Sequence, residues 1–368
     1  MGCSLSGLSA LYDAVNGGGD VWINQNRFRI VKQLGEGGFA FVYLVKEVAR
    51  DGAPSDGRRS SGKRLKNPNH VSENLINFAL YRFLSLSDDG SYALKKILIQ
   101  SEEQLVLVKE EIRVSSLFNH PNMLPLLDHA ILAVKGPGDL WYHEAYLLFP
   151  VYLDGSLLDN FKALQSKKEF FSALYVLQIF RQICVGLQQM HSFDPPYAHN
   201  DVKPGNVLIT HRKEQPPLAV LMDFGSARHG KREIRSRSEA LQLQVNKSLS
   251  IDEYEWAAEH CSAPFRAPEL WDCPSHADID ARTDIWALGC TLYAIMYGAS
   301  PFEYALDSGG SLQLAIMNVQ IRWPSSANPP FPESFHQFIT WMLQPQPSIR
   351  PFIDDVILHV DKLILNSS

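Results

Sequence analysis

The sequence is poor in cysteine and has no long apolar run. It contains only five cysteines among 368 residues, and they are Cys3, Cys184, Cys261, Cys273 and Cys290. Thiols so few and scattered exclude a disulfide framework, and without a CxxC pair they do not suggest a zinc site. A reduced, intracellular compartment is therefore expected. No apolar run reaches the ~18 residues that a membrane-spanning helix needs, and the N-terminus lacks the apolar core of a secretory signal.

A strong net charge and internal repeats are also missing. The chain has 34 Lys+Arg against 40 Asp+Glu, a formal charge of −6, so we expect no nucleic-acid partner. An apolar content of 45% with 20% charged residues is typical of a globular protein. At about 100–200 residues per domain, the length predicts two or three compact units.

The N-terminus carries a pattern for lipid attachment. In Met1-Gly2-Cys3-Ser4-Leu5-Ser6, Gly2 and Ser6 match the myristoylation pattern. A glycine after the first methionine is common, but here Cys3 adds a palmitoylation site. One myristoyl chain binds a membrane only marginally, whereas two chains bind stably. We therefore expect lipidation at Gly2 and Cys3.

The chain divides into a strand-rich N-terminal part and a helix-rich C-terminal part. Residues 1–27 read as a flexible arm, because they are small, polar and rich in glycine. The later pattern predicts a helix over 102–118, strands near 124–132 and 145–153, and helices over 172–192 and 283–297.

Residues 49–90 read as an insertion between two predicted strands. Their first part is a polar, basic loop, and the apolar stretch 73–86 follows. Loop-closure entropy grows slowly with length, so a fold can tolerate such an insert. The apolar stretch could pack on the N-terminal part, touch a membrane, bind a partner or reflect a splicing or gene-model error.

A glycine cluster lies between two strand patterns. It runs Gly35-Glu36-Gly37-Gly38-Phe39-Ala40-Phe41-Val42 and approximates G-x-G-x-x-G-x-V, with Ala40 in the third glycine place. Glycines allow a backbone to approach phosphate groups closely, although many such matches are ordinary hairpin turns.

Lys95 lies on the next predicted strand. If it is functional, it needs a carboxylate to orient its ammonium group, and we expect Glu111 to supply it, with Glu110 as the second choice. We expect Lys96 to be an exposed strand lysine.

Three further motifs follow in order along the chain. They are His199-Asn200-Asp201-Val202-Lys203-Pro204-Gly205-Asn206, then Asp223-Phe224-Gly225, then Ala267-Pro268-Glu269. With the glycine cluster and Lys95, they resemble the eukaryotic protein kinases over roughly residues 28–362. The resemblance implies an α+β fold of two lobes. A small antiparallel-sheet lobe with one helix would span 28–152, and a larger, mainly helical lobe 153–364.

The resemblance also implies roles for the motif residues, with ATP and Mg²⁺ as cofactors. Asp201 would accept the proton of the attacking hydroxyl, and Lys203 would touch the γ-phosphate and mark serine/threonine specificity. Asn206 and Asp223 would hold Mg²⁺, because hard cations prefer oxygen ligands. Lys95, oriented by Glu111, would bind the α- and β-phosphates. Ser262 would contact both Asp201 and Lys203.

The same resemblance implies which residues would bind the nucleotide. Phe149 would be the gatekeeper, Pro150 would offer its carbonyl to adenine and Tyr152 its N–H. The base would lie among Val42, Ala93 and Leu208, which are equally suited to core packing. The whole nucleotide-binding set would be Leu34, Gly35, Glu36, Gly37, Gly38, Phe39, Ala40, Val42, Ala93, Lys95, Glu111, Phe149, Pro150, Tyr152, Leu208 and Asp223.

Two scaffolding contacts are implied as well. Glu269 would pair with Arg350. Asp284 would hold the backbone of the catalytic loop, which is the motif from His199 to Asn206. A buried ion pair that loses one partner costs roughly 3–5 kcal/mol, so we interpret Glu269 and Arg350 as structural residues.

The sequence departs from the kinase pattern in two places. Asn200 replaces the arginine that receives an activation-loop phosphate in the family, which predicts activity independent of that phosphorylation. The activation segment, 223–269, is long and contains a basic stretch at 228–237. Within this segment, Ser250 and Glu253 form a capping-box pattern, which predicts an extra helix over 250–259.

Together these features resemble the myristoylated and palmitoylated serine/threonine kinases of the Numb-associated group. That resemblance implies a constitutively active, autophosphorylating enzyme with protein substrates. It would lie on the cytoplasmic face of Golgi, vesicle or plasma membranes, with a cytosolic pool. A catalytically weak membrane scaffold is the alternative, and Ala267-Pro268-Glu269 disfavours a small-molecule kinase.

Overall fold

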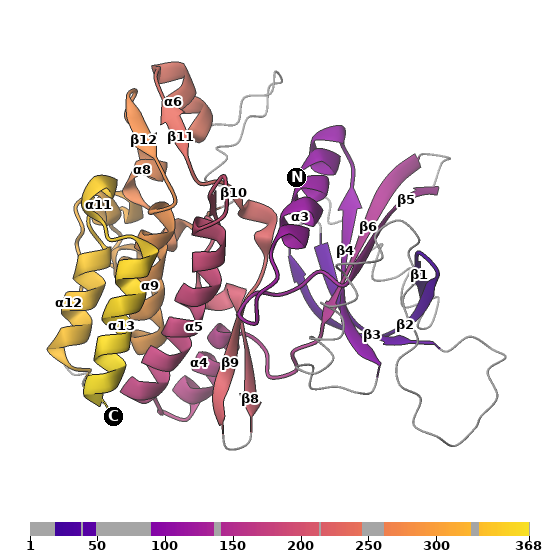
Figure 1. Ribbon diagram of the computed structural model, residues 1–368, viewed down its shortest axis with the longest axis horizontal. Coiled ribbons are helices and arrows are strands. Elements are labelled where there is room, and N and C mark those ends of the chain that lie inside the picture. Colours follow the sequence, from indigo (N-terminus) through magenta and orange to yellow (C-terminus); the bar gives the residue numbers. More distant parts are fainter. Residues whose placement is uncertain are drawn as a thin grey trace. The chain divides into compact units, whose positions relative to one another are not determined.

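The computed structural model describes residues 19–37, 40–48, 90–135, 141–212, 215–244, 261–324 and 331–367. The chain divides into two compact units (Figure 1). The first unit comprises Met1–Asn119 and Pro125–Tyr152, and the second comprises His120–Leu124 and Leu153–Ser368. The predicted insert at 49–90, apart from Gly90, and the predicted helix over 250–259 lie outside the described residues, as do Gly2 and Cys3.

In its described residues, the first unit is a six-stranded antiparallel sheet with one helix. The strand order is β1-β2-β3-β4-β6-β5. The elements are β1 (Asp20–Ile23), β2 (Asn26–Gly37), β3 (Ala40–Glu47), β4 (Ser91–Ile99), α3 (Glu102–Leu117), β5 (Asp128–Lys135) and β6 (Trp141–Pro150). Helix α3 confirms the helix predicted over 102–118. Ser101 caps the N-terminus of this helix, because its hydroxyl accepts a hydrogen bond from the Gln104 amide at 3.2 Å.

The N-terminal arm is shorter than the sequence suggested. Residues 20–27 form β1 and the start of β2, so the assignment of 1–27 as an arm is wrong over this stretch. The reason is alternation: Ile23 is fully buried with Phe28, and Val21 packs against the same cluster. Strand β1 thereby extends the sheet beyond β2 and adds Ile23 to the apolar cluster.

Two predicted strands are displaced. The strand expected near 124–132 is β5 at 128–135, and the one expected near 145–153 is β6 at 141–150. Pro125 has no N–H for a ladder, and Leu124 instead donates its amide to the carbonyl of Leu221 at 2.8 Å. The apolar run at 124–127 therefore belongs to a connection and not to the strand.

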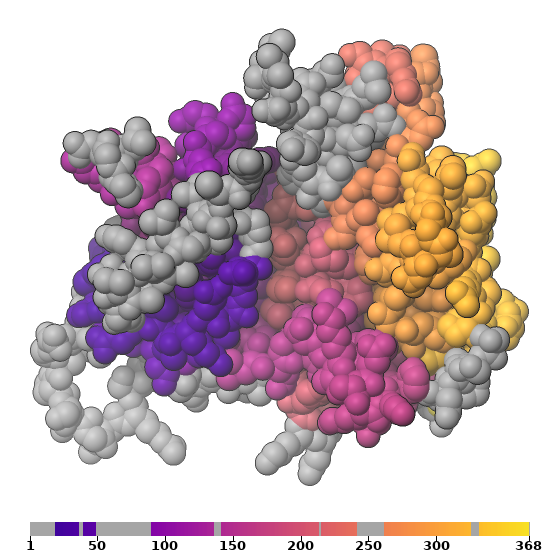
Figure 2. All heavy atoms as spheres, turned by 180° about the vertical axis from the view of Figure 1, so that it is seen from behind, coloured from indigo at the N-terminus to yellow at the C-terminus, as the bar shows by residue number. Residues whose placement is uncertain are grey.

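The second unit is mainly helical. Among the described residues, its helices of four or more residues are α4 (Leu157–Ser166), α5 (Ala173–His191), α6 (Arg237–Gln244), α8 (Pro268–Trp271), α9 (Thr283–Tyr297), α10 (Tyr304–Asp307), α11 (Leu312–Met317), α12 (Glu333–Met342) and α13 (Ile353–Ser367). Helices α5 and α9 confirm the helices predicted over 172–192 and 283–297. Helix α13 packs on α5, and α12 packs on α9. Residues 261–324 and 331–367 form adjoining orange and yellow surfaces in Figure 2.

Short strands of the second unit position its loops. They are β7 (Tyr197–Ala198), β8 (Val207–Arg212), β9 (Gln215–Leu221), β10 (Arg228–His229), β11 (Arg232–Ile234) and β12 (Ala277–Ile279). Strand β10 pairs with β7 just before the catalytic loop, β11 pairs with β12, and β8 pairs with β9. Among the described residues, no helix is both long and apolar enough to cross a membrane.

A buried ion pair ties the end of the activation segment to the rest of the second unit. Both Arg350 nitrogens Nη1 and Nη2 lie 2.6 Å from the Glu269 carboxylate oxygens. Arg350 also donates to three backbone carbonyls, including that of Arg282 at 3.1 Å. This geometry confirms the expected Glu269–Arg350 contact.

Candidate active site

The catalytic-loop backbone is held by one carboxylate. Asp284, at the start of α9, is fully buried. Its Oδ2 accepts the amide N–H of His199 at 2.7 Å, and its Oδ1 accepts that of Asn200 at 2.8 Å. The His191 imidazole nitrogen Nε2 lies 3.0 Å from Oδ2. The contact expected of Asp284 is thus confirmed, and His191 adds a side chain that the motifs did not indicate.

Asn200 suits its position without carrying a charge. Its φ is 65°, in the left-handed region where asparagine is enriched among non-glycine residues. Its Nδ2 donates to the carbonyls of Ala198 at 3.3 Å and Ser226 at 3.1 Å. A neutral amide therefore connects the catalytic loop to the start of the activation segment.

Three donors surround the carboxylate of Asp201, which is 8% exposed. Oδ1 accepts the amide N–H of Ser262 at 3.0 Å. Oδ2 accepts Lys203 Nζ and Asn206 Nδ2, both at 2.8 Å. Lys203 also donates to the Ser262 hydroxyl at 2.6 Å, which confirms the contacts expected of Ser262. A carboxylate fixed in this way is oriented to accept a hydrogen bond from a hydroxyl group.

Two side chains of the same unit, those of Asn206 and Asp223, have oxygen atoms that suit a divalent cation. Asn206 uses its Nδ2 on Asp201, so its side-chain oxygen is oriented elsewhere. The Met222 amide donates to the Asn206 carbonyl at 2.9 Å, which ties Asp223 to the catalytic loop. Asp223 has a φ of 65°. An amide oxygen and a carboxylate fit a hard cation that also binds phosphate oxygens. Among the described residues, no group of three His, Cys, Asp or Glu side chains is placed to bind a metal.

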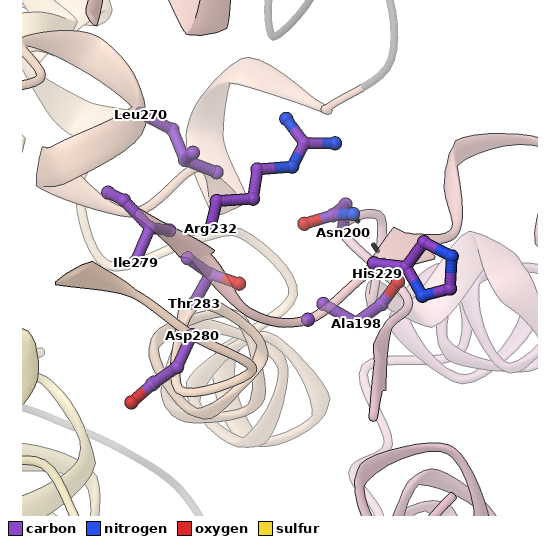
Figure 3. A pocket seen from close by; sticks show the side chains of 9 residues that line it. Ala198, Asn200, His229, Arg232, Leu270, Ile279, Asp280 and Thr283 are labelled. Atoms are coloured by element: carbon purple, nitrogen blue, oxygen red, sulfur yellow. Dashed lines mark hydrogen bonds between the residues drawn. The ribbon is translucent and has the colours of Figure 1, made fainter. Parts of the chain in front are cut away.

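A hollow opens beside the catalytic loop (Figure 3). Its lining includes Ala198, Asn200 and His229 on one side and Arg232 and Thr283 on the other. Burial, and then the positive charge of nearby Arg228, lower the pKa of Arg232. Arg232, the arginine of the basic stretch that lines this hollow, is half-buried in the fold.

Hydrophobic packing holds the activation segment next to this hollow. Ile234 of β11 and Ala240 of α6 form a buried cluster with four side chains from the far end of the segment and beyond it, namely Cys261, Leu270, Cys273 and Ile279. Burial raises the pKa of Cys261 to about 12, so this thiol stays neutral and packs as an apolar group. Residues near the two ends of the segment are thereby packed in one cluster.

Lys95 and Lys96 point to opposite faces of β4. Lys95 Nζ lies 2.7 Å from Glu111 Oε1 on α3, as expected, and Glu110 instead pairs with Arg113. The expectation that Lys96 is exposed is wrong: its side chain is 19% exposed and pairs with buried Glu144 at 3.1 Å. The Lys96 ammonium also lies 6.0 Å from the centroid of the Tyr146 ring, so side chains of the neighbouring strand β6 cover it.

The remaining described nucleotide-site candidates in the first unit lie on four adjacent strands, except Tyr152, which follows the last of them. Leu34, Gly35, Glu36 and Gly37 are on β2, Ala40 and Val42 are on β3, and Gly38 and Phe39 lie outside the described residues. Val42 is paired with Lys95, and Ala93 with Phe149. Phe149 is buried, Pro150 ends β6 opposite Tyr92, and Tyr152 is half-buried. Leu208, on β8 of the second unit, is half-buried.

Comparison with known proteins decides the family. The family described as "Protein kinase domain" matches residues 79–360. Serine/threonine-protein kinase 16 of Homo sapiens is 32% identical over 345 residues, covering 94% of this chain and 93% of its own. The rat protein of that name is equally similar. Serine/threonine-protein kinase ppk13 of Schizosaccharomyces pombe is 28% identical, covering 93% and 92%.

The chain belongs to the protein kinase family. It is a serine/threonine protein kinase, with the antiparallel-sheet lobe and helical lobe of that fold. Such kinases transfer the γ-phosphoryl group of ATP with the help of divalent metal ions. The family match begins at residue 79, so the glycine cluster of this kinase precedes the matched residues.

Adjacent lysines provide a matched test of the site in the first unit. We expect Lys95→Met to lower kcat at least about 100-fold, because positioning of the phosphates supplies most of the catalysis in phosphoryl transfer. Lys96→Met should retain kcat and lower the thermal midpoint, because it leaves the buried Glu144 carboxylate without its lysine. Steady-state transfer from ATP to casein and thermal unfolding measure both effects. Equal losses of kcat in the two variants would contradict the assignment of Lys95.

Proposed function

We propose that this serine/threonine kinase uses Asp201 as the base, Asn206 and Asp223 as Mg²⁺ ligands, and Lys203 and Lys95 as phosphate contacts. The hydrogen bonds that converge on Asp201 carry the proposal, because they orient its carboxylate through the catalytic loop and the activation segment together. Nucleotide contacts come from the glycine cluster and the strands that follow it. The kinase belongs, in this proposal, to the Numb-associated group.

The kinase is active without phosphorylation of its activation segment. Three neutral connections support this part of the proposal. Asn200 donates to the Ser226 carbonyl, β11 pairs with β12, and the apolar cluster around Ile234 joins both ends of the segment. None of these connections needs a phosphate group. The kinase also phosphorylates its own chain, in the same way as it phosphorylates other protein substrates.

Phosphatase treatment tests this independence. Kinase that has been dephosphorylated, with its state checked by mass spectrometry, should transfer phosphate to casein at an initial rate within about twofold of the untreated protein. Its progress curve should be linear from the start, because the activation segment is already in place. Loss of activity, or a lag that vanishes after preincubation with ATP, would refute the proposal.

The kinase attaches to the cytoplasmic face of membranes through lipids on Gly2 and Cys3. The adjacency of the two sites supports this, since two acyl chains are needed for stable anchoring. Golgi and vesicle membranes are the proposed locations, with a cytosolic pool of the unacylated or singly acylated protein.

Fractionation of cells that express three variants tests the attachment. Gly2→Ala should move the kinase into the soluble fraction. It removes the myristoyl chain, and with it the first contact with the membrane, which precedes attachment of the second acyl chain to Cys3. Cys3→Ser should leave only weak, salt- and wash-sensitive binding. Ser4→Ala is the matched control, because it keeps the pattern and should remain in the membrane fraction. Membrane retention of Gly2→Ala would contradict the proposal.

A further inference from the structure

Arg266 is a buried cation in the activation segment, next to the proposed base. It follows the short turn Ala263–Phe265 and is 4% exposed. Its guanidinium carbon lies 4.3 Å from the centroid of the Trp271 ring, a cation–π contact that holds the group against the ring. Because Arg266 is buried, it is not placed to contact a protein substrate.

The guanidinium holds one end of a particular peptide unit. Arg266 Nη2 donates a hydrogen bond to the carbonyl of Cys261 at 2.9 Å. The other end of the same peptide unit is the N–H of Ser262, which donates to Asp201 Oδ1 at 3.0 Å. The peptide between Cys261 and Ser262 is therefore bound at both its oxygen and its nitrogen.

Planarity couples these two hydrogen bonds. The six atoms of a peptide unit lie close to one plane, so fixing the direction of the carbonyl also fixes the direction of the N–H. A cation on the carbonyl oxygen polarises the peptide group and strengthens the hydrogen bond that its N–H donates. The charge of Arg266 thus acts on Asp201 without contact between the two side chains.

We propose that Arg266 is a positioning residue for Asp201, acting through the peptide unit between Cys261 and Ser262. The cation–π contact with Trp271 holds the guanidinium, the guanidinium binds the peptide carbonyl, and the peptide N–H binds Oδ1 of the carboxylate. The proposal rests on the assignment of Asp201 as the base. It concerns the rate of phosphoryl transfer and not the binding of ATP.

Arg266→Met tests the proposal, because methionine fills a similar space without a donor or a charge. We expect kcat for transfer from ATP to casein to fall about 10- to 100-fold, since a 1 Å misplacement of a catalytic group costs about 100-fold. The KM for ATP should stay within about twofold. Arg237→Met is the matched control, because Arg237 also donates to a backbone carbonyl, that of Cys273, but its side chain is exposed and this carbonyl is not part of the peptide unit that contacts Asp201. It should keep the wild-type kcat.

A purely structural role predicts a different result. In that case Arg266→Met lowers the thermal midpoint while the folded fraction retains the wild-type kcat, and this outcome would overturn the proposal. If the methionine variant does not fold, Arg266→Lys decides. An ammonium group cannot lie flat on Trp271 and hold the Cys261 carbonyl in the same geometry, so kcat should fall about fivefold. A wild-type kcat in the folded lysine variant overturns the proposal.

The activity of the wild-type protein in the same assay distinguishes a failure of the proposed function from a failure of the role proposed for Arg266. Absence of phosphoryl transfer by the folded wild-type protein would contradict the proposed function itself. Normal transfer by the wild type together with normal transfer by folded Arg266→Met would overturn only the role of Arg266.

Discussion

The buried carboxylate of Asp284 is the constraint on which the arrangement of the second unit depends. A carboxylate without solvent must receive hydrogen bonds for its charge to be tolerated. Here the donors are the backbone of His199 and Asn200 and the ring of His191. Because two of these donors are the peptide groups immediately before Asp201, satisfying Asp284 sets the course of the catalytic loop. Asp201, Lys203 and Asn206 then follow within six residues.

The activation segment completes this arrangement from the other side. Ser262 donates its amide to Asp201 and receives Lys203 on its hydroxyl. Its position depends in turn on Arg266, on the apolar cluster around Ile234 and, farther along, on the Glu269–Arg350 pair. Removing one partner of such a buried pair leaves an uncompensated charge and costs about 3–5 kcal/mol. The contacts nearest Asp201 are thus supported by packing and by ion pairs that contact no substrate.

Much of this could be predicted from sequence because the residues sit in short, ordered motifs. Asp201, Lys203 and Asn206 are close neighbours in the chain, and the partners of Lys95 and Glu269 could be inferred from the family resemblance. The expectation that Lys96 is exposed was wrong. The sequence did not reveal the ion pair that buries Lys96, because its partner Glu144 lies on a different strand, far along the chain.

His191 and Arg266 escaped prediction for a similar reason. Their partners are a side chain 93 positions away and a backbone carbonyl next to a motif residue, and neither leaves a local pattern. A histidine in the last turn of the helix before the catalytic loop was the only available sign for His191. Strand ends near Pro125 and Pro150 were also misplaced, since tertiary hydrogen bonds, and not hydrophobicity, determine where the ladder stops.

The central claim is that the described contacts orient Asp201 to receive the proton of the substrate hydroxyl. The most direct measurement is the single-turnover rate of phosphoryl transfer from ATP to casein by Asp201→Asn, compared with wild type at equal nucleotide occupancy. Asparagine keeps the size of the side chain and an oxygen acceptor but loses the charge and the basicity. The account predicts a loss of at least about 100-fold, the usual scale of general-base catalysis, with the protein still folded. Equal single-turnover rates would contradict it.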